Sequence, residues 1–383
     1  MKKKILITNG HLRIGGVEKS LVNFLRAIDY SRYDVDLLLF EGTGEYLSEV
    51  PKEVNIILCD LSQTYGSFFD VVRKNFPNRK VIWRKTITIL ASKFDQRYLK
   101  HLVKSKEYDV ALAYRVGMPM DYVSYGVKAE KKYFWWHAGS FSYPEYLSKC
   151  WKESAQQMDG MICVSNTIKD IVKPYFESYV KEILVIPNMI SVQETTTEVN
   201  DWHQDADSHM IVSVGRFSEE KHMSDCVVAT KELLHEGYDN LRWYLLGDGP
   251  EKEQAQNKII SEGLQDNVFC LGNITDPYAY MKNADLIVHP SYVESQGMTV
   301  LEAMALRKLV VATRSDGVKE YAIDHENALI AEMNLNSLVS KIEEAFNMNE
   351  DDKMKICEAA KKTADKYRPE VIMRQIERDL FED

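Results

Sequence analysis

Two glutamates eight positions apart carry the most specific chemical signal in the sequence. Glu294 lies in a loop after an apolar run, and Glu302 lies near the start of the helix that follows. An ionised carboxylate accepts hydrogen bonds from paired sugar hydroxyls. The backbone N–H groups of Gly297, Met298 and Thr299, at the helix N-terminus, favour an anion such as a phosphate. The alternatives are a solvated helix carboxylate for Glu302 and a helix-cap acceptor for Glu294.

Two cations follow the first apolar run of the second half of the chain. Arg216 comes directly after Gly215, where the run Met210–Val214 ends, and Lys221 follows in the same loop. A forked guanidinium and a compact ammonium together suit a diphosphate, which carries about two negative charges. An ordinary solvated loop is the alternative interpretation.

The first half of the chain carries two looser signals. Gly15 and Gly16 open the first helical stretch, and paired glycines let backbone N–H groups approach a ligand closely. Their spacing matches neither the dinucleotide fingerprint nor a Walker loop, so a tight strand–helix turn is the alternative. His137 follows an apolar run and precedes Gly139. A lone histidine is usually structural, but this strand-end position favours an active-site role.

Short apolar runs alternate with helical stretches and must position these residues. The alternation predicts an α/β fold of two doubly wound, Rossmann-like domains with parallel sheets, facing a cleft at the carboxyl ends of their strands. We expect domains over residues 1–190 and 209–365, joined by a polar linker over 191–208. The expected strands are Lys4–Thr8, Asp36–Phe40, Asn55–Cys59, Asp109–Arg115, Tyr133–Trp136, Met161–Val164, Ile183–Ile186, Met210–Val214, Leu241–Leu246, Val268–Leu271, Leu286–His289 and Leu309–Thr313.

These motifs together resemble those of the retaining glycosyltransferases of family 4, which have the GT-B architecture. The matching pieces keep the family's order from residue 15 to residue 302. They are Gly15-Gly16, Val164-Ser165, Ile186–Asn188, Val212–Lys221, Leu246–Pro250 and the E-x7-E stretch Glu294–Glu302. The resemblance implies an acceptor-binding first domain, a nucleotide-sugar-binding second domain, and a C-terminal helix over 366–383 that packs on the first domain.

The resemblance also implies a role for each motif. Arg216 and Lys221 would hold the donor diphosphate, Glu302 the ribose and Glu294 the transferred sugar. His137 would contact that sugar or stabilise developing charge, which makes His137, Arg216, Lys221 and Glu294 the expected catalytic residues. The expected donor-binding residues are Gly15, Gly16, Gly215, Arg216, Lys221, Ile274, Glu294, Gly297, Met298, Thr299 and Glu302.

The implied reaction is transfer of a hexose or N-acetylhexosamine, with retention, from a nucleoside-diphosphate sugar to a saccharide or lipid-linked saccharide. Bacterial capsule or cell-envelope polysaccharide synthesis is the expected setting. We expect no cofactor and no catalytic metal, because Asp34–Asp36 opens a strand, Asp205–Asp207 lies in the linker, and cationic side chains take the metal's place. The alternatives are a non-catalytic nucleotide-sugar-binding or partner subunit, and another nucleotide-sugar enzyme such as an epimerase.

Charge is divided unevenly along the 383 residues, whose formal net charge is −10. An acidic chain argues against a nucleic-acid partner. The residues through Ile190 carry a net charge of +7 and the remainder −17. The six cysteines are widely spaced with no C-x-x-C pair, which indicates a reducing cytoplasm.

The positive charge is concentrated between Arg73 and Lys106, where eleven Lys and Arg stand against one acidic residue. Apolar residues are interleaved with these cations, as in segments that lie on anionic membranes. We therefore expect a peripheral contact with the inner face of the plasma membrane, and a solvated helical face is the alternative. The expected membrane or acceptor surface comprises Arg79, Lys80, Arg84, Lys85, Lys93 and Arg97.

Overall fold

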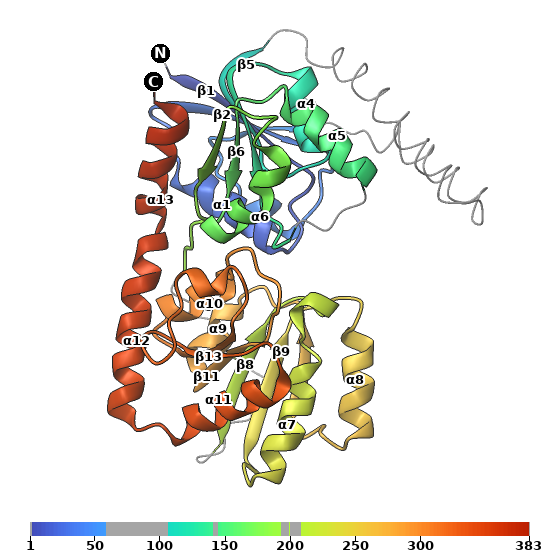
Figure 1. Cartoon of the computed structure of the whole chain (residues 1–383), viewed down its shortest axis with the longest axis vertical. Coiled ribbons are helices and arrows are strands. Elements are labelled where there is room, and N and C mark those ends of the chain that lie inside the picture. The colour runs from blue at the N-terminus through green and yellow to red at the C-terminus, as the bar shows by residue number, and fades with distance from the viewer. Residues whose placement is uncertain (1, 59–105, 141–144, 193–198, 200–207, 383) are drawn as a thin grey trace, which may run out of the picture. The chain divides into compact units, whose positions relative to one another are not determined.

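The computed structural model describes residues 2–58, 106–140, 145–192, 199 and 208–382. The chain divides into two compact units, one of Met1–Met189 with Pro369–Asp383 and the other of Ile190–Arg368 (Figure 1). The predicted linker at 191–208 lies largely outside the described residues. In the described part of the chain, no helix is long and apolar enough to cross a bilayer.

The first unit is built on a seven-stranded parallel sheet in the order β3-β2-β1-β4-β5-β6-β7. Its order reverses between β1 and β4, which makes these two strands the switch point of the sheet. The strands are β1 (Lys3–Asn9), β2 (Tyr33–Leu39), β3 (Asn55–Leu58), β4 (Glu107–Ala113), β5 (Lys128–Trp136), β6 (Gly160–Cys163) and β7 (Glu182–Val185). The α-helices are α1 (Gly16–Ala27), α4 (Met118–Gly126), α5 (Glu145–Ala155), α6 (Asn166–Phe176) and α13 (Pro369–Ile376).

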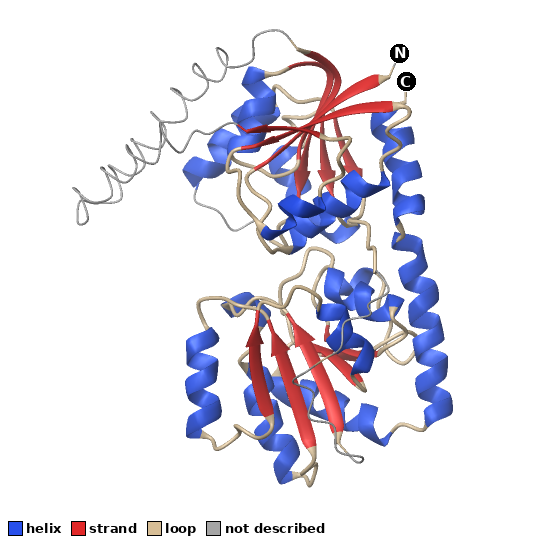
Figure 2. Ribbon diagram, turned by 180° about the vertical axis from the view of Figure 1, so that it is seen from behind, coloured by secondary structure: helices blue, strands red, loops and turns tan. Residues whose placement is uncertain are grey.

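The second unit has a six-stranded parallel sheet in the order β10-β9-β8-β11-β12-β13, with its switch point between β8 and β11. Figure 2 shows the strands and helices of the chain from behind. The strands are β8 (His209–Val214), β9 (Leu241–Leu246), β10 (Val268–Gly272), β11 (Leu286–His289), β12 (Leu309–Thr313) and β13 (Leu329–Ala331). The α-helices are α7 (Asp225–His235), α8 (Lys252–Ser261), α9 (Pro277–Asn283), α10 (Met298–Ala305), α11 (Leu335–Asn347) and α12 (Glu350–Ala364), and short turns are η2 (Glu219–Lys221) and η3 (Val318–Glu320).

Burial on both sheet faces explains the near-continuous apolar runs of the sequence. Ile5 and Ile7 of β1 point into one apolar core, whereas Leu6 points into the core on the opposite face. Strands covered on both sides cannot alternate apolar with polar residues. The prediction of two doubly wound α/β domains is confirmed. The edge strand β13 was not among the expected strands, because three residues are too few for a recognisable period.

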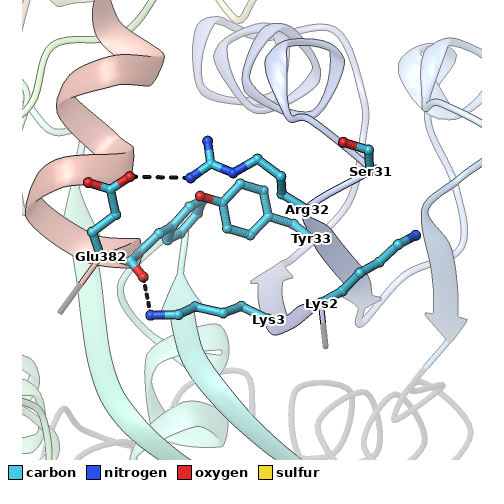
Figure 3. Close-up of a pocket in the computed structure, with 7 residues that line it drawn as sticks. Lys2, Lys3, Ser31, Arg32, Tyr33 and Glu382 are labelled. Carbon is cyan, nitrogen blue, oxygen red and sulfur yellow. Dashed lines mark hydrogen bonds and ion pairs between the residues drawn. The ribbon is translucent and has the colours of Figure 1, made fainter.

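The C-terminal segment is anchored on the first unit. Ile372, Met373 and Ile376 of α13 belong to the same core as β1. The Lys3 ammonium donates to the Phe381 carbonyl at 2.6 Å, and Arg32 donates to Glu382 at 3.2 Å (Figure 3). The prediction that the C-terminal helix packs on the first domain is therefore confirmed.

A cavity of about 570 Å³ lies beside this anchor. Its lining residues are Lys2, Lys3, Ser31, Arg32, Tyr33, Phe381 and Glu382. Lys3 and Tyr33 begin β1 and β2, so the cavity lies at the amino ends of these strands. Ligands of doubly wound sheets bind at the opposite, carboxyl ends.

Candidate active site

The switch point of the second sheet brings the two strongest motifs together. Strands β8 and β11 pair side by side, with Leu286 opposite Ile211. Gly215 and Arg216 leave the carboxyl end of β8, and Glu294 lies in the loop after β11. Segments far apart in the sequence thus meet at the edge where ligands of this fold bind.

Backbone contacts between loops set the position of Arg216. The amide of Gly215 donates to the Leu246 carbonyl at 2.9 Å, and that of Phe217 donates to Asp248 at 3.0 Å. Gly247 has a φ of 141°, and a Cβ there would lie 1.9 Å from the Gly215 oxygen. Only glycine permits this approach. The Leu246–Pro250 motif is therefore a backbone support for the turn that carries the exposed Arg216.

Lys221 and Glu294 form a largely buried ion pair. The Lys221 ammonium lies 2.6 Å from Glu294 Oε1, and the two side chains are 23% and 11% exposed. His289, the last residue of β11, places its Nε2 2.8 Å from the same carboxylate oxygen. The carboxylate is thus held by two partners from separate elements. The interpretation of Glu294 as a helix-cap acceptor is wrong, since its carboxylate accepts from Lys221 and His289 rather than from an amide of α10.

These partners determine the ionisation of Glu294. Burial by itself raises the pKa of this carboxyl, but the Lys221 ammonium and the hydrogen bond from His289 outweigh burial. The net result is a pKa well below the usual range. Glu294 is therefore a carboxylate at neutral pH and acts as a hydrogen-bond acceptor only.

Neighbouring turns hold the loop of Glu294 in place. The Glu220 carbonyl accepts from the Tyr292 amide at 3.1 Å, which joins the Lys221 turn to the loop after β11. The Gly317 amide donates to the Glu294 carbonyl at 3.0 Å. A Cβ on Gly317 would lie 2.4 Å from the backbone nitrogen of Gln296, so this contact also requires glycine.

The N-terminus of α10 presents backbone donors in the same region. Gly297 caps the helix in the left-handed conformation, with φ 74° and ψ 56°. Its carbonyl accepts from Val300 and Leu301, so the amides of Met298 and Thr299 have no partner within the helix. Such an end favours an anion.

Glu302 is buried within α10. Its residue is 4% exposed, and its Oε1 accepts from the Tyr278 hydroxyl at 2.9 Å. A solvated helix carboxylate is therefore the wrong interpretation. Ile274, after β10, is half-buried and packs against the apolar core on the α10 side of the sheet.

The switch point of the first unit holds a second charged group. The Glu18 carboxylate folds back over Gly15, where an added Cβ would lie 2.5 Å from Glu18 Oε2. Arg115, just after β4, donates to Glu18 Oε1 at 2.8 Å. Space is open around Gly16, where an added Cβ would meet no atom within 4 Å. The Gly15-Gly16 turn therefore makes room for a carboxylate at the helix start.

His137 lies beside this group and is electrically neutral. Burial and the nearby Arg115 guanidinium lower its pKa to about 3. Its ring lies 4.8 Å from the ring of Tyr114, and neither ring nitrogen has a hydrogen-bond partner in the described part of the chain. A neutral imidazole forms hydrogen bonds but supplies no positive charge. Asn9, at the end of β1, likewise has a buried Oδ1 with no partner among the described residues.

Sequence reasoning did not single out Asn9, Glu18, Arg115, Tyr278 and His289. Asn9, Arg115 and His289 are polar residues at or just after the end of a strand. This position in the sequence is the signal by which they could have been found. The role of Tyr278 as a partner of Glu302 follows from packing alone.

Other predicted sites have different outcomes. The basic residues Arg79, Lys80, Arg84, Lys85, Lys93 and Arg97 lie outside the described residues. Asp36, weighed as part of a metal pair, accepts hydrogen bonds from Asn55, Lys106 and Tyr108. Among the described residues, no group of His, Cys, Asp and Glu is arranged to hold a metal ion.

Comparison with known proteins supports the sequence motifs. Residues 194–363 match the family model "Glycosyl transferases group 1". An α-monoglucosyldiacylglycerol synthase from Streptococcus pneumoniae is 33% identical over 172 residues, covering 40% of this chain and 37% of that protein. An uncharacterized glycosyltransferase of Methanocaldococcus jannaschii is 29% identical over 202 residues, covering 52% and 53%. The chain spans about half the length or less of these curated relatives.

Solved structures show the fold over nearly the whole chain. A variant of TarM from S. aureus, in complex with Fondaparinux, alpha-GlcNAc-glycerol and UDP, aligns with a TM-score of 0.74 at 16% identity. The alignment covers 97% of this chain and 98% of that one. HepE from Anabaena, in complex with UDP-glucose, aligns with a TM-score of 0.71 at 17% identity and covers 98% of both chains. The GT-B fold expected from the motifs is confirmed.

The low pKa of Glu294 predicts how Glu294→Gln changes stability with pH. A carboxyl whose folded pKa is depressed stabilises the fold above its unfolded pKa of about 4.3, and this stabilisation is lost as the pH falls through the folded pKa. At pH 7 we expect the variant to lose about 1.5–3 kcal/mol, the worth of a charged hydrogen bond. Thermal unfolding measured between pH 8 and pH 3 should show that the difference in stability between the unaltered chain and the variant becomes smaller below about pH 4.3. The exposed Glu326→Gln serves as control, and a pH-independent gap would contradict the assigned ionisation.

Proposed function

We propose that the chain is a retaining enzyme that transfers a sugar from a nucleoside-diphosphate donor, and the match of residues 194–363 to the group 1 glycosyl transferases supports this proposal. The observation that carries the proposal is the Lys221–Glu294 pair, with Arg216 in the same loop as Lys221 and the N-terminus of α10 directly after Glu294. Cations and oriented backbone donors suit a departing diphosphate. A carboxylate acceptor beside them suits sugar hydroxyls.

Each group has a defined task in this proposal. Arg216, Lys221 and the amides of Met298 and Thr299 stabilise the negative charge that grows on the leaving diphosphate. Glu302 accepts from the ribose, and Glu294 accepts from a hydroxyl of the transferred sugar. The contacts with the diphosphate strengthen as its charge develops, so they lower the barrier more than they strengthen ground-state binding.

The bond changes balance without a protein nucleophile. The bond between the anomeric carbon and the diphosphate oxygen breaks, and the acceptor oxygen attacks the same face of the sugar. The acceptor proton passes to the leaving diphosphate oxygen. His137 in its neutral form contacts a sugar hydroxyl through an unpaired ring nitrogen, which favours the first of its two expected roles over charge stabilisation.

We propose a UDP-sugar as the donor and a saccharide or lipid-linked saccharide as the acceptor, in bacterial cell-envelope synthesis at the cytoplasmic membrane surface. Solved proteins of this fold were captured with UDP and UDP-glucose. One relative is named for a glucosylated diacylglycerol product. A non-catalytic binding subunit remains the second candidate, because donor-binding residues suit either role. Turnover by the purified chain separates the two.

Removing the donor contacts tests the proposal directly. We expect Lys221→Ala and Glu302→Ala each to reduce transfer by about 10–100-fold or more, since each removes a charged hydrogen bond worth roughly 1.5–3 kcal/mol. Release of nucleoside diphosphate measures turnover, and circular dichroism confirms that both variants are folded. Lys319→Ala alters an exposed pair with Asp316 and should leave transfer unchanged. If both site variants turned over the donor at the rate of the unaltered chain, the proposal would be wrong.

A thermal-shift screen should identify the donor nucleotide. UDP-glucose, UDP-N-acetylglucosamine and GDP-mannose are the probes, each from low to high concentration. A donor at 100 times its Kd raises the unfolding free energy by about 2.7 kcal/mol, so a UDP-sugar should raise the melting temperature most. Lys221→Ala should lessen that shift. A larger shift with GDP-mannose would overturn the assignment of UDP.

Vesicle co-sedimentation tests membrane contact. We expect the chain to sediment with anionic vesicles at low salt and to detach at high salt, at roughly 1 kcal/mol per cation near the surface. Replacing Arg79, Lys80, Arg84 and Lys85 by Gln should weaken binding, and neutral phosphatidylcholine vesicles are the control. Absence of binding to anionic vesicles would retire the membrane role.

A further inference from the structure

His289 has a position that the donor contacts do not explain. It ends β11, is 5% exposed, and lies with its Nε2 2.8 Å from Glu294 Oε1. The neighbouring strand β12 pairs with β11 at this position, where His289 lies opposite Ala312. Both burial and this backbone contact restrict the residue. The imidazole is therefore directed at one atom, the carboxylate oxygen that Lys221 also contacts.

Lys221 and His289 contact the same oxygen of Glu294, and this affects Glu294 when a donor binds. Lys221 is the cation of the pair, and a diphosphate with about two negative charges attracts it. A lysine side chain is flexible and can turn toward the new anion. Glu294 would then lose its main countercharge while staying largely buried. A buried carboxylate without partners is costly and tends to take up a proton.

We propose that His289 is a positioning residue that keeps Glu294 ionised and oriented while Lys221 is drawn to the diphosphate of a bound donor. This inference rests on the proposed function. The Nε2–H tautomer donates to Oε1, and the ring is supported by a strand, whereas Lys221 lies in a short turn. Glu294 thereby remains an acceptor for a sugar hydroxyl at the moment when it is needed.

Among the described groups around Glu294, His289 is the one that can keep the carboxylate ionised and oriented when Lys221 moves away. Among the described residues, the charged and titratable groups that act on Glu294 are Lys221 from η2 and His289 from β11, and the Tyr321 phenol lies near it. Burial raises the pKa of Tyr321 well above its usual value, so the phenol stays neutral. Its hydroxyl already donates to the Gly297 carbonyl at 3.0 Å. Once Lys221 turns away, the imidazole is the donor that remains.

Two substitutions separate positioning from general structure. His289→Ala removes the donor, whereas His289→Gln keeps an N–H near the position of Nε2. We expect His289→Ala to lower kcat by about 10–100-fold at pH 7, as displaced catalytic groups do, with a smaller change in the donor KM. The acid limb of its kcat profile should move to higher pH, because Glu294 has lost a donor that lowers its pKa. His289→Gln should restore both properties to near the unaltered values.

The measurements are steady-state kinetics from pH 4.5 to pH 8 on the full chain, with the donor identified by thermal shift, and melting temperatures of every variant. His235→Gln, on the exposed end of α7, is the matched control. Equal kinetics in the unaltered chain and in His289→Ala would overturn the inference alone. The inference would also be overturned if His289→Ala and His289→Gln lowered kcat equally and the acid limb of the kcat profile did not move. That result would indicate that His289 acts only through its packing. No turnover by the unaltered chain would overturn the proposed function, and this inference with it.

Discussion

A largely buried carboxylate in the loop after a parallel strand is the constraint on which the site of the second unit depends. Glu294 can remain charged only if cations or hydrogen-bond donors surround it. Lys221 and His289 supply them, and each arrives from a different strand end. The loops that bring them are locked by backbone bonds and by glycines that admit no side chain. The pairing therefore couples the position of the Lys221 ammonium to that of the Glu294 carboxylate.

The first unit solves a similar problem with different residues. Glu18 is buried at the start of α1 and is paired with Arg115 from the end of β4. The same guanidinium helps to keep His137 neutral. A positive charge at this end thus comes from Arg115, while the imidazole keeps its hydrogen-bonding capacity. Charge and neutral hydrogen-bonding capacity are thus carried by two different side chains at this end of the sheet.

The two ends of the first sheet serve different purposes. At the amino ends of β1 and β2, Lys3 and Arg32 anchor the C-terminal segment and line a cavity with it. Asn9, Arg115 and His137 lie at the carboxyl ends, and their side chains can form hydrogen bonds or, for Arg115, supply positive charge. Parallel strands make such a division natural, because all their carboxyl ends meet at one edge.

The amino-acid sequence by itself determined the two α/β domains, the order of their strands along the chain and the residue types of the proposed donor site. Period, apolar continuity and motif spacing are local properties, so they are readable without a structure. The tertiary structure decided which groups share an atom. That Lys221 joins His289 at Glu294, that Glu302 is buried against Tyr278, and that His137 is neutral all depend on contacts between segments distant in sequence. The edge strand β13 also required the structure, since three residues pair only when a neighbouring strand is in place. Burial and pairing are properties of the packed chain, and the spacing of residues in the sequence does not predict them.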